Sequence, residues 1–357
     1  MLKAKKFKQV RRTLRQNLAK SIGKNNVIRN VKPGEKINVK SILVCRPNHR
    51  LGNLLLVTPL LQEIIHHFPD CKIDLFVKAG LAPILFKNYS NVDKLVQIPK
   101  KPLREIFKYL VGWSRIKKHS YDLVMNIDKG SSSGRMAVNL AKGRYKFFGD
   151  EYEQELRQFP GYIHIAKQPV YNFRLYLEKL GYDGIPKDAP VPSINILLSE
   201  AELEASRKLL NDLVPPTRKT IAIFTYATGE KCYSEAWWVD FYTRLKTAFP
   251  QYNIVEVLPV ENISRINFAA PSFYSKDVRE ICAFIANTAV FIGADSGIMH
   301  LASASQTPTV GLFSASNPAV YEPYSNNSTA LNTNETDAEK CIQAIRHILE
   351  STTALLT

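Results

Sequence analysis

The chain has 357 residues, which is enough for two domains of ordinary size that each bury a core. A hydrophobic content of 45% and a charged content of 22% indicate a globular protein and exclude a disordered one. We expect no transmembrane helix and no signal peptide, because no run of about 18 apolar residues or leader-like pattern is present. The cysteines favour a reducing compartment over a disulfide framework or zinc site, since they are scattered and odd in number: Cys45, Cys71, Cys232, Cys282 and Cys341.

The formal net charge of +16 is concentrated at the N-terminus. Residues 1–40 hold 13 Lys and Arg and a single acid, Glu35, so the remainder of the chain is only mildly basic. Apolar residues recur at helical spacing between Phe7 and Ile22, and basic residues surround them. We therefore expect residues 1–24 to form a helix on an anionic membrane surface. A solubilising arm or a helix docked on the protein itself are the alternatives, and no aromatic platform supports nucleic-acid binding.

Short apolar runs alternate with helical patterns after the basic segment. A helix is predicted over 58–69, with Thr58 as N-cap and Pro59 at the first helical position, and another over 103–119. This alternation predicts a parallel, doubly wound α/β sheet. The predicted strands cover residues 40–47, 71–78, 92–99 and 121–128.

The character of the chain changes near residues 184–219, where a proline-rich stretch precedes a predicted helix. Ser199 and Glu202 form a capping box for that helix, and Thr336 and Glu339 form another for the last helix. Strands are predicted over 220–225, 253–259, 289–294 and 307–313. We predict four parts: a basic amphipathic extension (1–40), an N-terminal α/β domain (41–190), a linker with a connecting helix (191–219) and a C-terminal α/β domain (220–357).

The stretch "FIGADSGIMHLASASQTPTVGLF" (291–313) places polar residues between two apolar strands. In open parallel sheets, ligands bind where strands end and helices begin. Asp295 is the expected N-cap, Ser296 and Gly297 bring backbone amides to the helix start, and His300 lies one turn further on. Such a helix start is typical of a phosphate site. The alternative is an ordinary capped helix with a structural histidine.

This stretch resembles the donor-site signature of the family 9 glycosyltransferases, the heptosyltransferase type. Asp295, Ser296, Gly297 and His300 match its D-[ST]-G-x-x-H motif, and residues 307–313 match the T-P-x-x-x-L-F strand that follows. The segment "RPNHRLGNLLLVTPLLQEIIHHFP" (46–69) is similar to the opening of the same family, and the resemblance extends over about residues 41–350.

The resemblance implies a GT-B architecture, two Rossmann-like doubly wound domains facing across a cleft. The C-terminal domain is expected to bind a nucleotide-sugar and the N-terminal domain a lipid-linked saccharide acceptor. The implied reaction is an inverting, metal-independent transfer of heptose or a related sugar to a lipopolysaccharide core or another surface glycolipid. No cofactor is expected beyond the donor substrate, ADP-heptose or a similar nucleotide-sugar. The implied location is the cytoplasm of a bacterium, peripheral at the inner face of its membrane.

The resemblance also assigns binding residues. Lys231 matches a lysine near the donor's phosphates, although Tyr233 and Ser234 replace the tryptophan-proline that usually follows. Glu261 takes the place of an acid that binds the nucleotide ribose, and it completes the donor set with Asp295, Ser296, Gly297 and His300. The expected acceptor and loop residues are Arg50, Gly52, Lys129 and Arg135.

The general base is where the chain departs from the family. An aspartate commonly follows the glycine of the first loop, and here that position is Asn53, whose amide accepts no proton at neutral pH. His49 and Asp128 are the alternative bases, and Asn53 can still orient the acceptor through hydrogen bonds. A catalytically weak or inactive nucleotide-sugar-binding relative is the second hypothesis. An unrelated oxidoreductase is disfavoured, because no G-x-G-x-x-G stands at a first βα turn.

Overall fold

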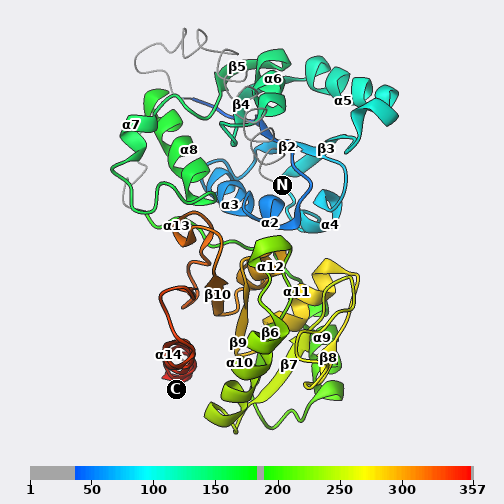
Figure 1. Ribbon diagram of the computed structural model, residues 1–357. Helices are drawn as coiled ribbons and strands as arrows, with labels where there is room; N and C mark the ends of the chain where they lie inside the picture. The colour runs from blue at the N-terminus through cyan, green and yellow to red at the C-terminus, as the bar shows by residue number, and fades with distance from the viewer. Residues whose placement is uncertain (1–36, 183–188, 355–357) are drawn as a thin grey trace, which may run out of the picture. The chain divides into compact units, whose positions relative to one another are not determined.

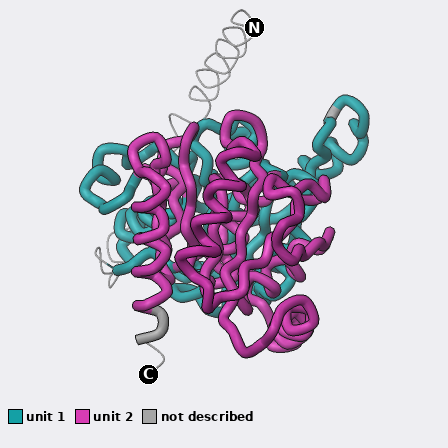
Figure 2. Tube along the Cα trace, turned by 60° about the horizontal axis from the view of Figure 1, so that its bottom comes forward, with its two compact units in different colours: residues 1–49, 60–162, 166–192 teal, residues 50–59, 163–165, 193–357 magenta. Residues whose placement is uncertain are grey.

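The computed structural model describes residues 37–182 and 189–354, and the chain divides into two compact units. Unit 1 contains residues 1–49, 60–162 and 166–192, and unit 2 contains 50–59, 163–165 and 193–357 (Figure 2). Two short segments of the N-terminal half therefore belong, by their contacts, to unit 2. The expected membrane-binding helix over 1–24 lies outside the described residues, and the domain roles assigned from the sequence stay predictions.

Unit 1 is built on a five-stranded parallel sheet in the order β3-β2-β1-β4-β5 (Figure 1). The four predicted strands form where the apolar runs place them. The fifth strand, β5, was not predicted, because its sequence KGRYKF carries basic residues suited to a sheet edge. The strands are β1 (Ser41–Arg46), β2 (Lys72–Lys78), β3 (Val92–Ile98), β4 (Ser120–Asn126) and β5 (Lys142–Phe147).

One face of this sheet is covered by α5 and α6, whose buried side chains share a core with the strands. Trp113 and Ile116 of α5 pack with Phe76 of β2 and Val96 of β3. The remaining helices include α8, which is buried almost all round. The helices of this part of the chain are α3 (Thr58–His67), α4 (Ala82–Leu85), η1 (Pro102–Arg104), α5 (Ile106–Lys118), α6 (Ser132–Leu140), α7 (Glu153–Leu156) and α8 (Lys167–Lys179).

A buried ion pair joins α3 to α8. The Arg174 guanidinium donates to both carboxylate oxygens of Glu63, at 2.6 and 3.1 Å, and to the carbonyls of Ala189 and Pro190. Both side chains are almost fully buried. Burial by itself raises the pKa of Glu63, but hydrogen bonds from His67 and Arg174 outweigh it and leave the pKa below its ordinary value. Glu63 and Arg174 therefore form a buried ion pair in which each charge is neutralised by the other.

Unit 2 is built on a six-stranded parallel sheet in the order β11-β10-β9-β6-β7-β8. Every residue of β6, β9 and β10 is buried, as expected for parallel strands covered by helices on both faces. Both sheets have the strand order of a doubly wound fold, which confirms the predicted fold class. The strands are β6 (Thr220–Phe224), β7 (Asn253–Val257), β8 (Ser272–Phe273), β9 (Val290–Ala294), β10 (Thr309–Phe313) and β11 (Thr329–Asn332).

The helices of unit 2 lie on the two faces of its sheet. On one face, Trp238 of α10 and Ile345 of α14 pack over strand residues such as Ile223 and Ile292. Helices α9 and α12 both contact α11. No helix within residues 37–182 and 189–354 combines the length and apolarity that crossing a bilayer requires. The helices are α2 (Leu51–Leu55), α9 (Glu200–Leu213), η2 (Gly229–Lys231), α10 (Glu235–Ala248), α11 (Val278–Ala286), α12 (Gly297–Ala304), α13 (Pro318–Tyr321) and α14 (Ala338–Ala354).

The two predicted capping boxes have different outcomes. The box of α9 is present, with Ser199 and Glu202 bonding reciprocally. The box predicted for α14 is wrong, because the Asp337 carboxylate accepts from the Lys340 amide at 2.9 Å and the helix begins at Ala338. Thr336 belongs to the preceding turn, where its amide donates to the Asn332 carbonyl at 2.9 Å.

Replacing Glu63 by glutamine tests the buried pair. The change leaves the Arg174 charge buried without a carboxylate, so we expect the free energy of unfolding of unit 1 to fall by about 3 kcal/mol. Urea unfolding followed by the fluorescence of Trp113, the one tryptophan of unit 1, measures it. The matched control is Asp93→Asn, which breaks an exposed pair with Lys94 and should cost less than about 1 kcal/mol. An equal loss of unfolding free energy in the two variants would contradict a stabilising role for the buried Glu63–Arg174 pair.

Candidate functional site

The candidate site lies in unit 2, at the carboxyl ends of β6 and β9. These neighbouring strands form the switch point of the sheet, where adjacent loops leave in opposite directions and ligands bind. A pocket of about 630 Å³ opens there, a size typical of small-ligand sites. Its lining comes from α2, η2, the start of α12 and α13, and consists of Arg50, Leu51, Gly52, Asn53, Leu56, Thr228, Lys231, Asp295, Ser296, Gly297, His300 and Tyr321.

Helix α12 begins at the pocket, and its N-cap is Ser296. The predicted cap was Asp295, which is wrong, because the Ser296 hydroxyl accepts from the Met299 amide at 3.2 Å. The amides of Gly297 and Ile298 donate to no acceptor in the part of the chain that the structure describes. Free first-turn amides and the positive end of the helix dipole favour an anion at this position.

Asp295 instead positions Lys231. The carboxylate is almost fully buried and accepts from the Lys231 ammonium and from the Ser316 hydroxyl. The Lys231 side chain is 38% exposed, and its ammonium lies 5.5 Å from the ring centroid of Tyr321. The lysine is therefore held at the pocket by a fixed carboxylate on one side and by an aromatic ring.

His300 is buried on α12, and its Nδ1 has no hydrogen-bond partner among the described residues. Burial lowers the pKa of His300 from 6.5 to about 4; the Asp295 carboxylate opposes this shift and the Lys231 charge adds to it. The imidazole is thus neutral at pH 7. A neutral ring offers one N–H donor and one acceptor nitrogen to a ligand in the pocket.

Two glycines allow α2 to pack closely against α12. A Cβ atom at Gly52 would lie 2.7 Å from Cδ2 of His300, closer than real carbon contacts. A Cβ atom at Gly297 would lie 3.2 Å from Cβ of Leu51 on the other helix. This packing brings Asn53 and Arg50 to the same pocket as the donor-site motif. Gly52, which was predicted as an acceptor or loop residue, thus allows the close packing of α2 on α12.

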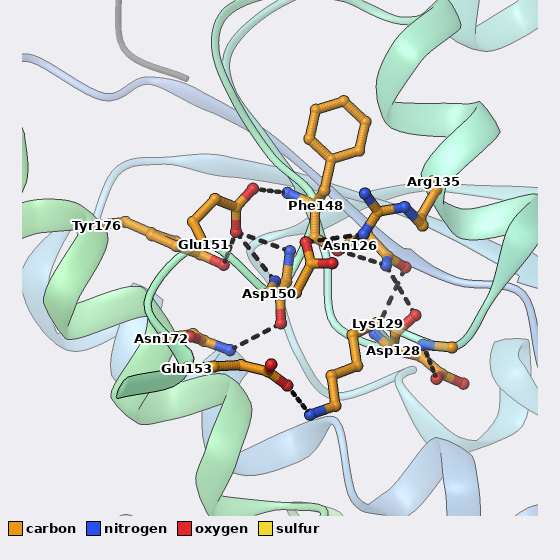
Figure 3. A network of polar contacts seen from close by, with 12 residues as sticks. Asn126, Asp128, Lys129, Arg135, Phe148, Asp150, Glu151, Glu153, Asn172 and Tyr176 are labelled. Atoms are coloured by element: carbon orange, nitrogen blue, oxygen red, sulfur yellow. Dashed lines mark hydrogen bonds and ion pairs between the residues drawn. The ribbon is translucent and has the colours of Figure 1, made fainter. Parts of the chain in front are cut away.

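The other predicted base and loop residues belong to unit 1. Asp128 forms an ion pair of 2.9 Å with the buried guanidinium of Arg46, and its other oxygen accepts from the Gly130 amide. Lys129 pairs with Glu153 in the network of Figure 3. His49 is exposed and follows β1.

Arg135 does not fit the predicted contact with an acceptor. Its side chain is 2% exposed, and its guanidinium donates to Asp150 at 2.8 Å and to the Phe148 carbonyl at 3.4 Å (Figure 3). The group also lies 5.1 Å from the Phe148 ring centroid. Arg135 therefore holds the segment after β5. Local sequence patterns do not indicate this role, because the partners of Arg135 come from another part of the chain.

Glu261 is exposed in the turn after β7 and does not line the pocket. The acid that sequence analysis missed is Glu256, fully buried on β7, whose carboxylate accepts from the Thr225 hydroxyl at 2.5 Å. Burial raises its pKa above the ordinary value. The Thr225 oxygen in turn accepts from the Arg265 amide, so this pair ties β6 and β7 to the following loop. A lone acid in the apolar run NIVEV was the available signal.

Comparison with known proteins identifies similar sequences. Residues 275–348 match the family model "Glycosyltransferase family 9 (heptosyltransferase)", a range that contains α12 and β10. The chain is 24% identical over 296 residues to lipopolysaccharide heptosyltransferase 3 of Escherichia coli, covering 77% of this chain and 84% of that protein. It is 21% identical over 319 residues to the lipopolysaccharide core heptosyltransferase OpsX of Haemophilus influenzae, covering 84% and 86%.

Solved structures share the fold. A family 9 glycosyl transferase from Veillonella parvula matches with a TM-score of 0.68 at 16% identity, covering 89% of this chain and 99% of that one. The E. coli heptosyltransferase WaaC with ADP matches with a TM-score of 0.61 at 16% identity, covering 86% and 99%. These matches confirm the predicted resemblance and the GT-B fold class.

The lowered pKa of His300 predicts a pH-dependent stability. The unfolded chain protonates this residue below pH 6.5, whereas the folded chain protonates it only near pH 4. Stability that is present above pH 6.5 is therefore lost as the pH falls towards 4. Between pH 7 and 4.5, we expect the free energy of unfolding of the wild type to fall more than that of His300→Gln, by on the order of 2 kcal/mol.

Denaturant unfolding at the two pH values, followed by the fluorescence of Trp237 and Trp238 in unit 2, measures this difference. The control is His347→Gln, which changes an exposed histidine of α14 and should keep the wild-type pH dependence. The same pH dependence in wild type and His300→Gln would contradict a neutral, buried His300.

Proposed function

We propose that this chain, a glycosyltransferase of the family 9 type, transfers heptose or a related sugar from a nucleotide-sugar to a lipopolysaccharide core or another surface glycolipid. The observation that carries the proposal is the pocket where Lys231, His300 and the free amides of α12 meet. The relatives named as lipopolysaccharide heptosyltransferases and the WaaC structure with ADP support ADP-heptose as the donor class. We further propose a cytoplasmic protein, peripheral at the membrane that holds the acceptor.

The diphosphate of the donor is proposed to bind at the start of α12. The Gly297 and Ile298 amides and the helix dipole face it, and Lys231 provides a positive charge beside it. His300, being neutral, provides a hydrogen bond without a charge. These groups stabilise the charge that develops on the leaving diphosphate, which is the basis for proposing a metal-independent reaction.

The proposed transfer is inverting. An acceptor hydroxyl oxygen forms a bond to the anomeric carbon as the bond from that carbon to the diphosphate oxygen breaks, and a base takes the hydroxyl proton. Asn53 lines the pocket and is proposed to orient the acceptor. His49 and Asp128 are the two proposed bases, and Asp128 forms an ion pair of 2.9 Å with the Arg46 guanidinium. Glu261 as a ribose contact stays a prediction.

The alternative proposal is a nucleotide-sugar-binding relative with weak activity or none. The observation in its favour is that Asn53 occupies the pocket position where the family commonly has an aspartate. Both proposals include the same donor-binding residues, so donor binding does not distinguish them. Only product formation does.

Release of nucleoside diphosphate from ADP-heptose, with and without a lipopolysaccharide-core acceptor, tests the enzyme. We expect release that depends on the acceptor. We expect Lys231→Ala to lower kcat/KM by about 10²-fold, because the positive charge that stabilises the leaving diphosphate is lost. Lys340→Ala, which removes an exposed lysine of unit 2, is the matched control and should be neutral. Donor binding without any diphosphate release would favour the inactive relative.

Asp128→Asn and His49→Asn, made singly, test the base. Loss of the base should lower kcat by about 10²- to 10⁴-fold with little change in donor affinity, because proton transfer alone is removed. Single-turnover kinetics measure the chemical step. If both variants turn over at the wild-type rate, neither residue is the base.

A further inference from the structure

Unit 1 exposes a continuous set of large apolar side chains on η1 and α5. Phe107 is 81% exposed, Leu103 95%, Leu110 58%, Ile106 52% and Val111 48%. At 100° per residue, the four positions on α5 fall within about 140° of the helix circumference, and Leu103 lies on the preceding turn η1. Single exposed apolar residues are common, but five neighbours along η1 and one face of α5 mark an interaction surface. We call these five residues the α5 apolar face.

The fold of unit 1 does not need this face. Helix α5 is seated on the sheet by its other side, where Trp113 and Ile116 are buried in the core. Gly112 brings the helix so close that a Cβ atom there would lie 2.9 Å from Cγ2 of Ile98. The α5 apolar face therefore takes no part in the packing of α5 on the sheet. Its exposed apolar side chains are available to contact another surface.

The charges around the α5 apolar face are almost all positive. The segment 100–118 contains seven Lys and Arg, all exposed, and one acid, Glu105, which already pairs with Lys108 at 2.9 Å. Beyond the C-terminus of α5, a pocket of about 470 Å³ continues the basic surface. The pocket is lined by the basic residues Lys94, Arg115, Lys118 and His119. Its one acid, Asp74, accepts a hydrogen bond of 2.8 Å from the Tyr121 hydroxyl.

We propose that η1 and α5 form a docking surface for a bilayer of anionic phospholipids. Apolar side chains of such a surface enter the boundary of the acyl chains, while Lys and Arg reach the headgroup phosphates. A second copy of the chain would place two positive rims against each other. The chain's own segment 1–24 is itself strongly basic, so the same repulsion opposes it as the occupant. Charge therefore favours the lipid surface.

Vesicle co-sedimentation of the full chain tests the surface and needs no catalytic activity, so its outcome is independent of the proposed transferase function. The variant carries Leu103→Gln, Phe107→Gln and Leu110→Gln, and the control carries Leu209→Gln and Val239→Gln, exposed apolar positions of unit 2. On phosphatidylethanolamine–phosphatidylglycerol vesicles, we expect the variant to lose at least about tenfold in partition coefficient and the control to keep the wild-type value. Wild-type binding by the variant would overturn the proposal.

A second measurement locates the contact. Phe107→Trp places a reporter on the α5 apolar face, and Val239→Trp places one on α10 as the control. We expect acyl chains brominated near the glycerol to quench the first tryptophan and not the second. Vesicle binding with an unquenched Trp at residue 107 would mean that another part of the chain, such as residues 1–24, makes the contact. Self-association in sedimentation that the triple variant abolishes would assign the face to a second copy and overturn the proposal.

Discussion

The close contact between α2 and α12 determines the geometry of the candidate site. A Cβ atom at residue 52 would lie 2.7 Å from the His300 ring, and one at residue 297 would lie 3.2 Å from Cβ of Leu51, so a side chain at either position would press on the facing helix. The contact brings the polar residues Arg50 and Asn53 to the pocket that the start of α12 opens. It also keeps water from His300, which is why that ring stays neutral beside a lysine and an aspartate.

The charge balance of the pocket is set before any ligand arrives. Asp295 is buried, and its Oδ2 accepts from both Lys231 and Ser316. A diphosphate in the proposed position would share the Lys231 ammonium with that carboxylate. The neutral His300 contributes no further charge, so the amides and dipole of α12 carry a large part of the anion's stabilisation. Backbone donors are fixed in place and cost little reorganisation.

The sequence was informative wherever burial on both sides of a strand leaves an apolar run. β1, β6, β9 and β10 were predicted for this reason, and the motif after β9 located the pocket because ligands bind at strand ends. β5 carries basic residues at a sheet edge, and α8 buries Arg174, so neither shows a simple apolar period. Roles that depend on a distant partner were beyond local patterns. Asp295 accepts from the distant Lys231, and Ser296 is the N-cap of α12. Arg135 is buried in an ion pair with Asp150.

The membership of residues 50–59 in unit 2 means that the chain leaves unit 1 after its first strand and returns within α3. The two units are therefore not consecutive pieces of the polypeptide, and no single cut separates them. A fragment that starts at Ser193 would retain the whole second sheet but lose the helix that covers His300. Solvent would then reach the imidazole, and its proton affinity would rise back towards that of a free histidine.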